Sequence, residues 1–220
     1  MSQSAAPNFG NDLIRIHRVI TRGLQTAIQH TQDLIKDNAA ADSGFLDYLA
    51  ALISVLDSHH MVEDEIAFPY LQQKRLPGPY QVLVAEHKTM AHTLEKIQEW
   101  LPDLSGEAPK AQSLVEVNQA LKSILGLWMG HIGREEESFS PKIAAALMGE
   151  EEHINLGRAM SQHAQQHSGP DYLVIPFILY NLNPKDRAIM MAAMPPVITQ
   201  ELLPGPWKEK WAAMQPYLLE

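Results

Sequence analysis

Apolar side chains recur about every 3.6 residues along the first two thirds of the chain, the spacing of one face of an amphipathic helix. The period is regular from Asp12 to about Lys36, and turn residues divide the following sequence into further segments. Helices are therefore expected at 12–36, 45–74, 80–100 and 111–147. This part of the sequence shows no alternating pattern typical of a strand.

Two of these helices contain a proline that should break their regularity. Pro69 is expected to bend or interrupt the second helix in its last turns, and Ser140-Pro141 should interrupt the fourth, because proline has no N–H to donate inside a helix. Four long helices with short connections predict an all-α protein. We expect residues 10–148 to form an up-down-up-down four-helix bundle, a fold that builds metal sites in its interior.

The chain changes character after residue 148. From Ser168 onward, closely spaced prolines leave no room for long helices, yet aromatic and aliphatic residues make the segment too apolar for a disordered tail. Residues 149–220 are therefore expected to form a proline-rich C-terminal helical extension of short helices and turns. It would pack on the bundle or on a dimer partner, so a homodimer formed through the extension is one expectation.

Composition narrows the kinds of site that this chain can hold. At 220 residues the chain can bury a core of ordinary size without disulfide bonds or structural metals. The absence of cysteine excludes thiolate zinc sites, iron–sulfur clusters on cysteine and thiol nucleophiles. A formal charge of −9 argues against nucleic acid or an anionic membrane as a partner. The sequence shows neither a leader-like segment nor a spanning apolar run, so a cytoplasmic protein is expected.

A histidine followed four residues later by a glutamate occurs twice in the predicted helices. The pairs are His59 with Glu63 and His131 with Glu135, and a proline follows each pair at the same distance. Residues four apart on a helix differ by about 40° in direction, so each pair can bind one metal, or adjacent metals, from one face. The repetition predicts two similar helical hairpins that face each other around a metal pair.

The other two predicted helices each carry one histidine on an apolar face, His17 and His87. A lone histidine on such a face is more often a hydrogen-bonded core residue than a ligand. Here, however, four helices each supply one, and two inward carboxylates would be costly to bury without a cation. His60 and His92 share faces with charged residues, so we assign them to solvent or to a supporting role beside the ligands.

The ligand types indicate which metal to expect. Six nitrogen and oxygen ligands, with two carboxylates able to bridge, suit two octahedral ions such as iron or manganese better than one tetrahedral zinc. Zinc remains an alternative. The predicted metal ligands are His17, His59, Glu63, His87, His131 and Glu135.

Two other histidine motifs are interpreted as structural. Glu150 and His153 have the three-residue spacing of ferritin-like carboxylate sites, but they lie in a charged run and are expected at a solvated helix start. His163 and His167 are four apart, but no glutamate of the zinc-protease kind lies between them. We expect them at an exposed helix end.

These residues, in this order and spacing, resemble the hemerythrin-like, or HHE cation-binding, domain family. The likeness rests on His17, the His59-His60-x-x-Glu63 segment with Phe68-Pro69, Glu86-His87 and His131-x-x-x-Glu135, and covers about residues 10–148. The resemblance implies a four-helix bundle with a non-haem di-iron centre bridged by two carboxylates and an oxo or hydroxo group. It assigns the metal to the same six residues.

The third helix departs from the oxygen-carrying members of this family, which take two histidines four apart from it. Here the position four after His87 is Ala91, and the nearest histidine is His92. Five residues rotate His92 by about 140° from His87, so a π-bulge would be needed to bring it in. The sequence therefore resembles the sensor and enzyme-like branches, whose fewer ligands leave an open coordination position.

Three functions are consistent with such a centre. The first is binding of O2 or NO for sensing, buffering or detoxification. The second is a di-iron oxidoreductase that reduces peroxide or oxidises NO, with the metal as electron source and Lewis acid. The third is iron storage or a structural metal. The expected partner is a small diatomic or peroxide ligand, and the sequence assigns no catalytic side chain beyond the metal ligands.

Overall fold

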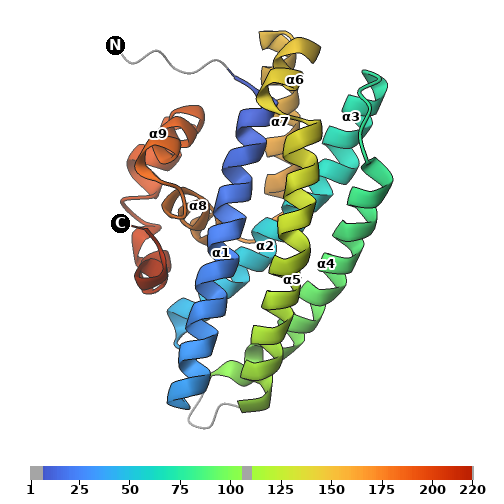
Figure 1. Ribbon diagram of the computed structural model, residues 1–220. Helices are drawn as coiled ribbons and strands as arrows, with labels where there is room; N and C mark the ends of the chain where they lie inside the picture. The colour runs from blue at the N-terminus through green and yellow to red at the C-terminus, as the bar shows by residue number, and fades with distance from the viewer. Residues whose placement is uncertain (1–6, 106–110, 220) are drawn as a thin grey trace.

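The computed structural model describes residues 7–105 and 111–219, and regular secondary structure within these residues is entirely helical. The all-α class predicted from the sequence is confirmed. The long helices are α1 (Phe9–Asp37), α2 (Ser43–Val62), α4 (Tyr80–Trp100) and α5 (Ala111–Ser138). Helix α1 contacts α5 and α2, and α4 contacts the same two helices, as Figure 1 shows.

The ends of α1 and the start of α2 follow from short polar side chains. Asn8 caps α1 by accepting a hydrogen bond from the N–H of Asn11, and Asp42 caps α2 in the same way through the N–H of Phe45. Asn38 ends α1 in the left-handed conformation at φ 50°, which asparagine tolerates better than most residues. The outer bounds of the four predicted helices lie within a few residues of the observed ones, although the second and fourth are each divided into shorter elements.

The expected interruption at Pro69 is confirmed, but it begins earlier in the chain. Helix α2 passes at Glu63 into the π-helix η1 (Glu63–Ala67), and α3 (Phe68–Gln73) follows. The N–H of Phe68 donates to the carbonyl of Glu63, five residues back. Because Pro69 has no N–H for the carbonyl of Glu65, the chain widens before the proline instead of continuing as an α-helix.

The second proline also acts as predicted. Helix α5 ends at Ser138, Ser140 is non-helical, and α6 (Pro141–Leu147) starts with Pro141 in its first turn, where a missing N–H costs nothing. Helix α7 (Glu150–His167) comes next. One expectation about α7 is wrong: His153 is not solvated but 7% exposed, and its Nδ1 accepts a hydrogen bond from the N–H of Phe9 at 3.2 Å.

From Ser168 onward the C-terminal extension consists of short helices, as its prolines predict, whereas its first helix, α7, is 18 residues long. The short helices are α8 (Asp171–Tyr180), α9 (Pro184–Ala193), the π-helix η3 (Val197–Leu202), α10 (Lys208–Trp211) and the 3-10 helix η4 (Ala212–Tyr217). Helices α8 and η4 contact α2, and Figure 1 shows the extension beside α1 and α2. Phe177 and Met214 are fully buried in the same hydrophobic cluster as Leu24 and Leu52.

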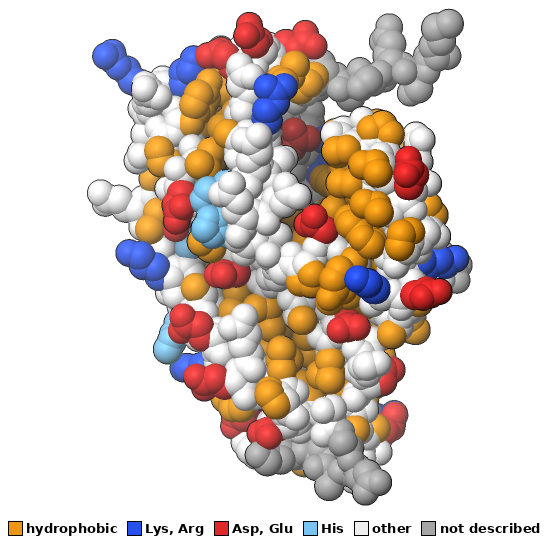
Figure 2. All heavy atoms as spheres, turned by 180° about the vertical axis from the view of Figure 1, so that it is seen from behind, with side chains coloured by type: hydrophobic (Ala, Val, Ile, Leu, Met, Phe, Trp, Pro, Cys, Tyr) orange, Lys and Arg blue, Asp and Glu red, His pale blue; other side chains and the backbone are white. Residues whose placement is uncertain are grey.

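Apolar side chains are also visible on the outer surface of the extension. Figure 2, which shows the molecule from behind, has many of them on the right, where the extension lies. Val197 of η3 is 46% exposed. Among the described residues, no helix is both long and apolar enough to cross a membrane.

Among the described residues, the core forms two hydrophobic clusters, and histidines of the candidate site contact both of them. The larger cluster includes Trp128 of α5, and the smaller one includes Phe68 of α3. The ring of Trp128 stacks on His131, and the ring of Phe68 stacks on His87. The histidines of the candidate site are therefore enclosed by apolar walls on two sides.

Candidate metal centre

The structure brings all six predicted ligands together in the interior. His17 comes from α1, His59 from α2, Glu63 from the start of η1, His87 from α4, and His131 and Glu135 from α5. Each residue is at most 7% exposed, and both glutamates are fully buried. Their roles as metal ligands stay a prediction, but the convergence on which that prediction depends is present.

The six residues form two overlapping sets of four. His17 and His59 make one set with the two glutamates, and His87 and His131 make the other set with the same two glutamates. Within each set, one ligand atom per residue lies within 4.8 Å of the others. The sharing of Glu63 and Glu135 is the arrangement that two carboxylates need to bridge two neighbouring ions.

The distances show how closely the side chains approach. The Nε2 atom of His17 lies 3.2 Å from Oε2 of Glu135, and Nε2 of His131 lies 3.3 Å from Oε1 of the same residue. On the opposite side, Nε2 of His59 and Nε2 of His87 each lie 3.5 Å from Oε2 of Glu63. The Nε2 atoms of His87 and His131 are 3.1 Å apart. In each of these histidines, Nε2 thus faces the shared glutamates.

The other ring nitrogen of three histidines faces a second layer of carboxylates. Each Nδ1 lies within 3.0 Å of a carboxylate oxygen; the pairs are His17 with Glu136, His87 with Asp64, and His131 with Glu86. Arg134 in turn forms an ion pair with Glu86. Metal-binding histidines commonly donate their outer N–H to a carboxylate, which fixes the tautomer and aims the other nitrogen at the metal.

Sequence reasoning missed these three outer carboxylates as parts of the site. It gave no role in the site to Asp64 or Glu136, and it cited Glu86 only as part of a resemblance. The signal that could have found them is adjacency, since Asp64, Glu86 and Glu136 each directly precede or follow a predicted ligand. Periodicity alone assigns a neighbouring residue to another face, and it does not reveal that this face contacts a histidine of the next helix.

The pKa values of the two shared glutamates are shifted in opposite directions. Burial, reinforced by the charge of Glu135, raises the pKa of Glu63 well above its usual range. Burial acts in the same direction on Glu135, but the nearby imidazoles of His131 and His17 outweigh it and hold its pKa below the usual range. Two carboxylates in one buried site cannot both ionise cheaply without a cation.

The pKa values of His17 and His59 are also shifted in opposite directions. Burial alone would lower the pKa of His17, but its contacts with Glu135 and Glu136 outweigh burial and raise the pKa. Burial lowers the pKa of His59 well below its ordinary value, and nearby His17 adds to that effect. His59 is therefore held neutral, the form in which imidazole binds metals.

Unpaired buried atoms show that a cation fits this site. Among the described residues, Nε2 of His17, Nε2 of His59 and all four carboxylate oxygens of Glu63 and Glu135 are buried without a hydrogen-bond partner. Such groups are costly to bury. They are nitrogen and oxygen acceptors aimed at one another, a donor set suited to first-row transition ions.

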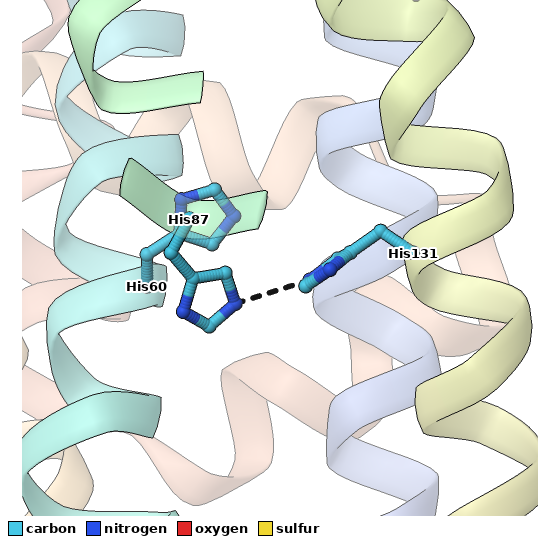
Figure 3. Close-up of side chains that lie close together, drawn as sticks. All are labelled: His60, His87 and His131. Carbon is cyan, nitrogen blue, oxygen red and sulfur yellow. Dashed lines mark hydrogen bonds between the residues drawn. The ribbon is translucent and has the colours of Figure 1, made fainter. Parts of the chain in front are cut away.

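His60 corrects part of the sequence analysis. We assigned it to solvent or to a supporting role, and the solvent alternative is wrong, since His60 is 3% exposed and its ring stacks on that of His87. Burial, followed by the effect of His87, lowers the pKa of His60 well below its usual value. Figure 3 shows the imidazoles of His60, His87 and His131 converging from α2, α4 and α5.

The remaining histidines lie outside the centre. The side chain of His92 is 68% exposed beside Glu95, and α4 is a continuous α-helix, so the π-bulge that would have brought His92 inward is absent there. His163 and His167 stack at the end of α7. The expectation that both are exposed is wrong for His163, whose side chain is 12% exposed and lies 2.8 Å from Glu65.

Comparison with known proteins places this chain in a family. The model of the hemerythrin HHE cation-binding domain matches residues 10–143. The chain is also similar to proteins named iron-sulfur cluster repair protein YtfE: it is 28% identical to that of Enterobacter sp. (strain 638) and 26% identical to those of Escherichia coli and Shigella boydii serotype 18. Each match covers 117 residues, 52% of this chain and 52% of the relative. The chain thus spans about half the length of the curated relatives it matches, and no solved structure gives a significant match.

Proposed function

This chain belongs to the hemerythrin HHE cation-binding domain family, and we propose that it is a non-haem di-iron protein that binds O2 or NO between its long helices. The single observation that carries the proposal is the sharing of two buried glutamates by two histidine pairs. One metal would be held by His17 and His59, the other by His87 and His131. Glu63 and Glu135 would bridge them, and an additional oxo or hydroxo bridge stays a prediction.

The protein's own residues would hold and orient this centre. The carboxylates of Asp64, Glu86 and Glu136 keep the outer nitrogens of three histidines protonated, so that the inner nitrogens can bind metal. The rings of Trp128 and Phe68, which stack on His131 and His87, would limit the access of water from those two sides. Iron at such a site supplies electrons and Lewis acidity.

The burial of the site favours a small ligand over a larger substrate. Every residue of the two sets is at most 7% exposed, so a molecule larger than a few atoms would need the helices to separate. A diatomic gas does not. A peroxide is also small, so the alternative of a di-iron oxidoreductase stays open beside gas binding, as does iron storage or a structural metal.

The proposal is tested by loading metal-free protein with Fe²⁺ under anaerobic conditions and then adding O2 or NO. We expect about two iron ions per chain and new near-ultraviolet and visible charge-transfer bands after the gas is added. A Glu63→Gln variant should lose both, whereas His92→Ala, which changes an exposed histidine of α4, should keep both. Wild-type protein that stays colourless and free of iron would contradict the proposal.

The similarity to the YtfE proteins favours a second candidate, a part in iron–sulfur cluster repair. This chain has no cysteine, so any iron it gave up would leave a site made of histidine and carboxylate. Mixing the iron-loaded protein with a cluster-free iron–sulfur protein, sulfide and a thiol reductant tests this candidate. Faster cluster formation than with an equal amount of free Fe²⁺ would support repair, and an equal rate would argue against it.

The division into domains, the oligomeric state and the location of the protein belong to the same proposal. We take residues 10–148 as an up-down-up-down four-helix bundle unit, which the contacts among α1, α2, α4 and α5 support, and residues 149–220 as its extension. The apolar surface of the extension (Figure 2) supports a homodimer formed there. A cytoplasmic location stays a prediction.

A further inference from the structure

His60 is a buried histidine for which the proposed metal pair does not yet account. Both of its ring nitrogens are buried, and neither has a hydrogen-bond partner among the described residues. Leaving two polar atoms unpaired in the interior costs free energy. An apolar side chain of similar size would fill the space without that cost, so packing alone gives no reason for an imidazole here.

The position of His60 supplies a reason. One ring nitrogen of His60 lies within 4.8 Å of nitrogens of both His87 and His131, and the three histidines form a group of their own. The ring of His60 stacks on that of His87 with centroids 4.1 Å apart, and its centroid is 5.6 Å from that of His131. His87 and His131 are also two of the four residues proposed to hold one ion of the pair.

Helix geometry explains how two adjacent residues can both reach the centre. Successive residues on an α-helix point about 100° apart, so His59 and His60 cannot easily bind the same ion. In the structure they belong to different groups, His59 with His17 and His60 with His87 and His131. Two ions lying side by side against α2 would receive one histidine each.

We infer that His60 is a further metal ligand, bound to the same ion as His87 and His131. The inference rests on the proposed metal pair. The two ions would then differ in their protein ligands: one would have three histidines and the two glutamates, the other two histidines and the same glutamates. The ion beside His17 and His59 would keep one position more open for a small ligand.

Zinc titration of metal-free protein tests this assignment without any enzymatic readout. Wild-type protein should bind two Zn²⁺ per chain, and His60→Leu should keep one site while the affinity of the other falls at least about 10-fold. His92→Leu, the same change at an exposed histidine, should titrate like wild type. Two sites of unchanged affinity in His60→Leu would overturn the inference and leave the proposed function standing, whereas a wild-type protein that binds no metal would overturn both.

A second measurement on wild-type protein remains decisive if His60→Leu does not fold. With nitrogen-15-labelled histidine, the ring nitrogen signals of His60, assigned through the backbone, should shift when Zn²⁺ is added, as should those of His17, His59, His87 and His131. The signal of His92 should stay in place. A His60 signal that does not move while the other four move would overturn the inference.

The metal-free stability of the variant gives a third readout. Because His60→Leu removes two unpaired buried nitrogens, the metal-free variant should melt at the wild-type temperature or about 2–4 °C above it. A lower melting temperature combined with unchanged zinc stoichiometry would show that His60 is a packing residue, contrary to the inference.

Discussion

At the scale of single residues, the centre depends on carboxylates that are not expected to touch a metal. Asp64 lies 2.8 Å from Nδ1 of His87 and thereby fixes which nitrogen of that ring faces Glu63. An outer carboxylate of this kind also makes the imidazole a stronger donor. It can be altered without removing any of the predicted ligands.

We expect Asp64→Asn to weaken metal binding about 10–100-fold while leaving the helix content unchanged. The amide can still accept a hydrogen bond from His87, but it carries no charge. Competition between the protein and a chelator of known affinity measures the change. Glu95→Gln is the matched control, because it makes the same chemical change beside the exposed His92. Equal loss in both variants would show that the effect is general electrostatics.

The convergence of the six candidate ligands could be predicted from the sequence, but their surroundings could not. A histidine and a glutamate four apart must share a helix face, so the pairing of His59 with Glu63 follows from helix geometry alone. The burial of His60 depends on where α4 places His87, which no pattern within residues 45–74 records. Contacts between helices distant in sequence therefore set the limit of the prediction.

At the scale of elements, the extension approaches α2 closely at a glycine. A Cβ added at Gly44 would lie 1.9 Å from the backbone carbonyl oxygen of Ala213 in η4. A backbone atom cannot rotate away as a flexible side chain can. Gly44 therefore allows η4 to pack on the first turn of α2.

Gly44→Ala should lower the free energy of unfolding by about 1–3 kcal/mol, because the two backbones must separate. Gly126→Ala is the control, since a Cβ there meets no atom within 4 Å among the described residues. That variant should instead gain about 0.5–1 kcal/mol from better helix propensity. Urea denaturation of both variants measures the two values, and a gain in both would show that the close approach costs nothing.

The elements were easier to predict than the way they are interrupted. Periodicity and proline positions located the long helices and both breaks, because these signals are local. The conversion of Glu63–Ala67 into a π-helix could not be predicted in this way. A proline removes one hydrogen bond, but packing against the neighbouring helices decides whether the chain kinks, stops or widens.

At the scale of the whole molecule, an ion pair between a largely buried aspartate and a half-exposed arginine links the extension to the first helix. Asp186 of α9 lies 2.6 Å from Arg18 and 3.6 Å from Arg15, both on α1. Burial alone would raise the pKa of Asp186, but contacts with Asn183 and Arg18 outweigh it and hold the pKa below the usual value. The ionised form of Asp186 therefore stabilises the folded state.

Asp186→Asn should lower the free energy of unfolding by about 1–3 kcal/mol at pH 7. A depressed pKa adds stability above the unfolded value of about 3.9, and that stability is lost as pH falls through the folded value. The difference between wild type and variant should therefore shrink below about pH 4. Urea denaturation from pH 7 to pH 3 tests this, with Glu209→Gln, at an exposed carboxylate of α10, as the control. A difference that stays constant with pH would contradict it.

The outer carboxylates have a consequence for electrical balance. Glu63 and Glu135 at the centre, with Asp64, Glu86 and Glu136 around them, make five acidic groups, and Arg134 offsets one of them. Fully ionised, this assembly carries the charge that two divalent ions would neutralise, whereas one such ion would leave it half compensated. Residues that are not expected to touch a metal would thus help to set the total ionic charge that the interior accepts.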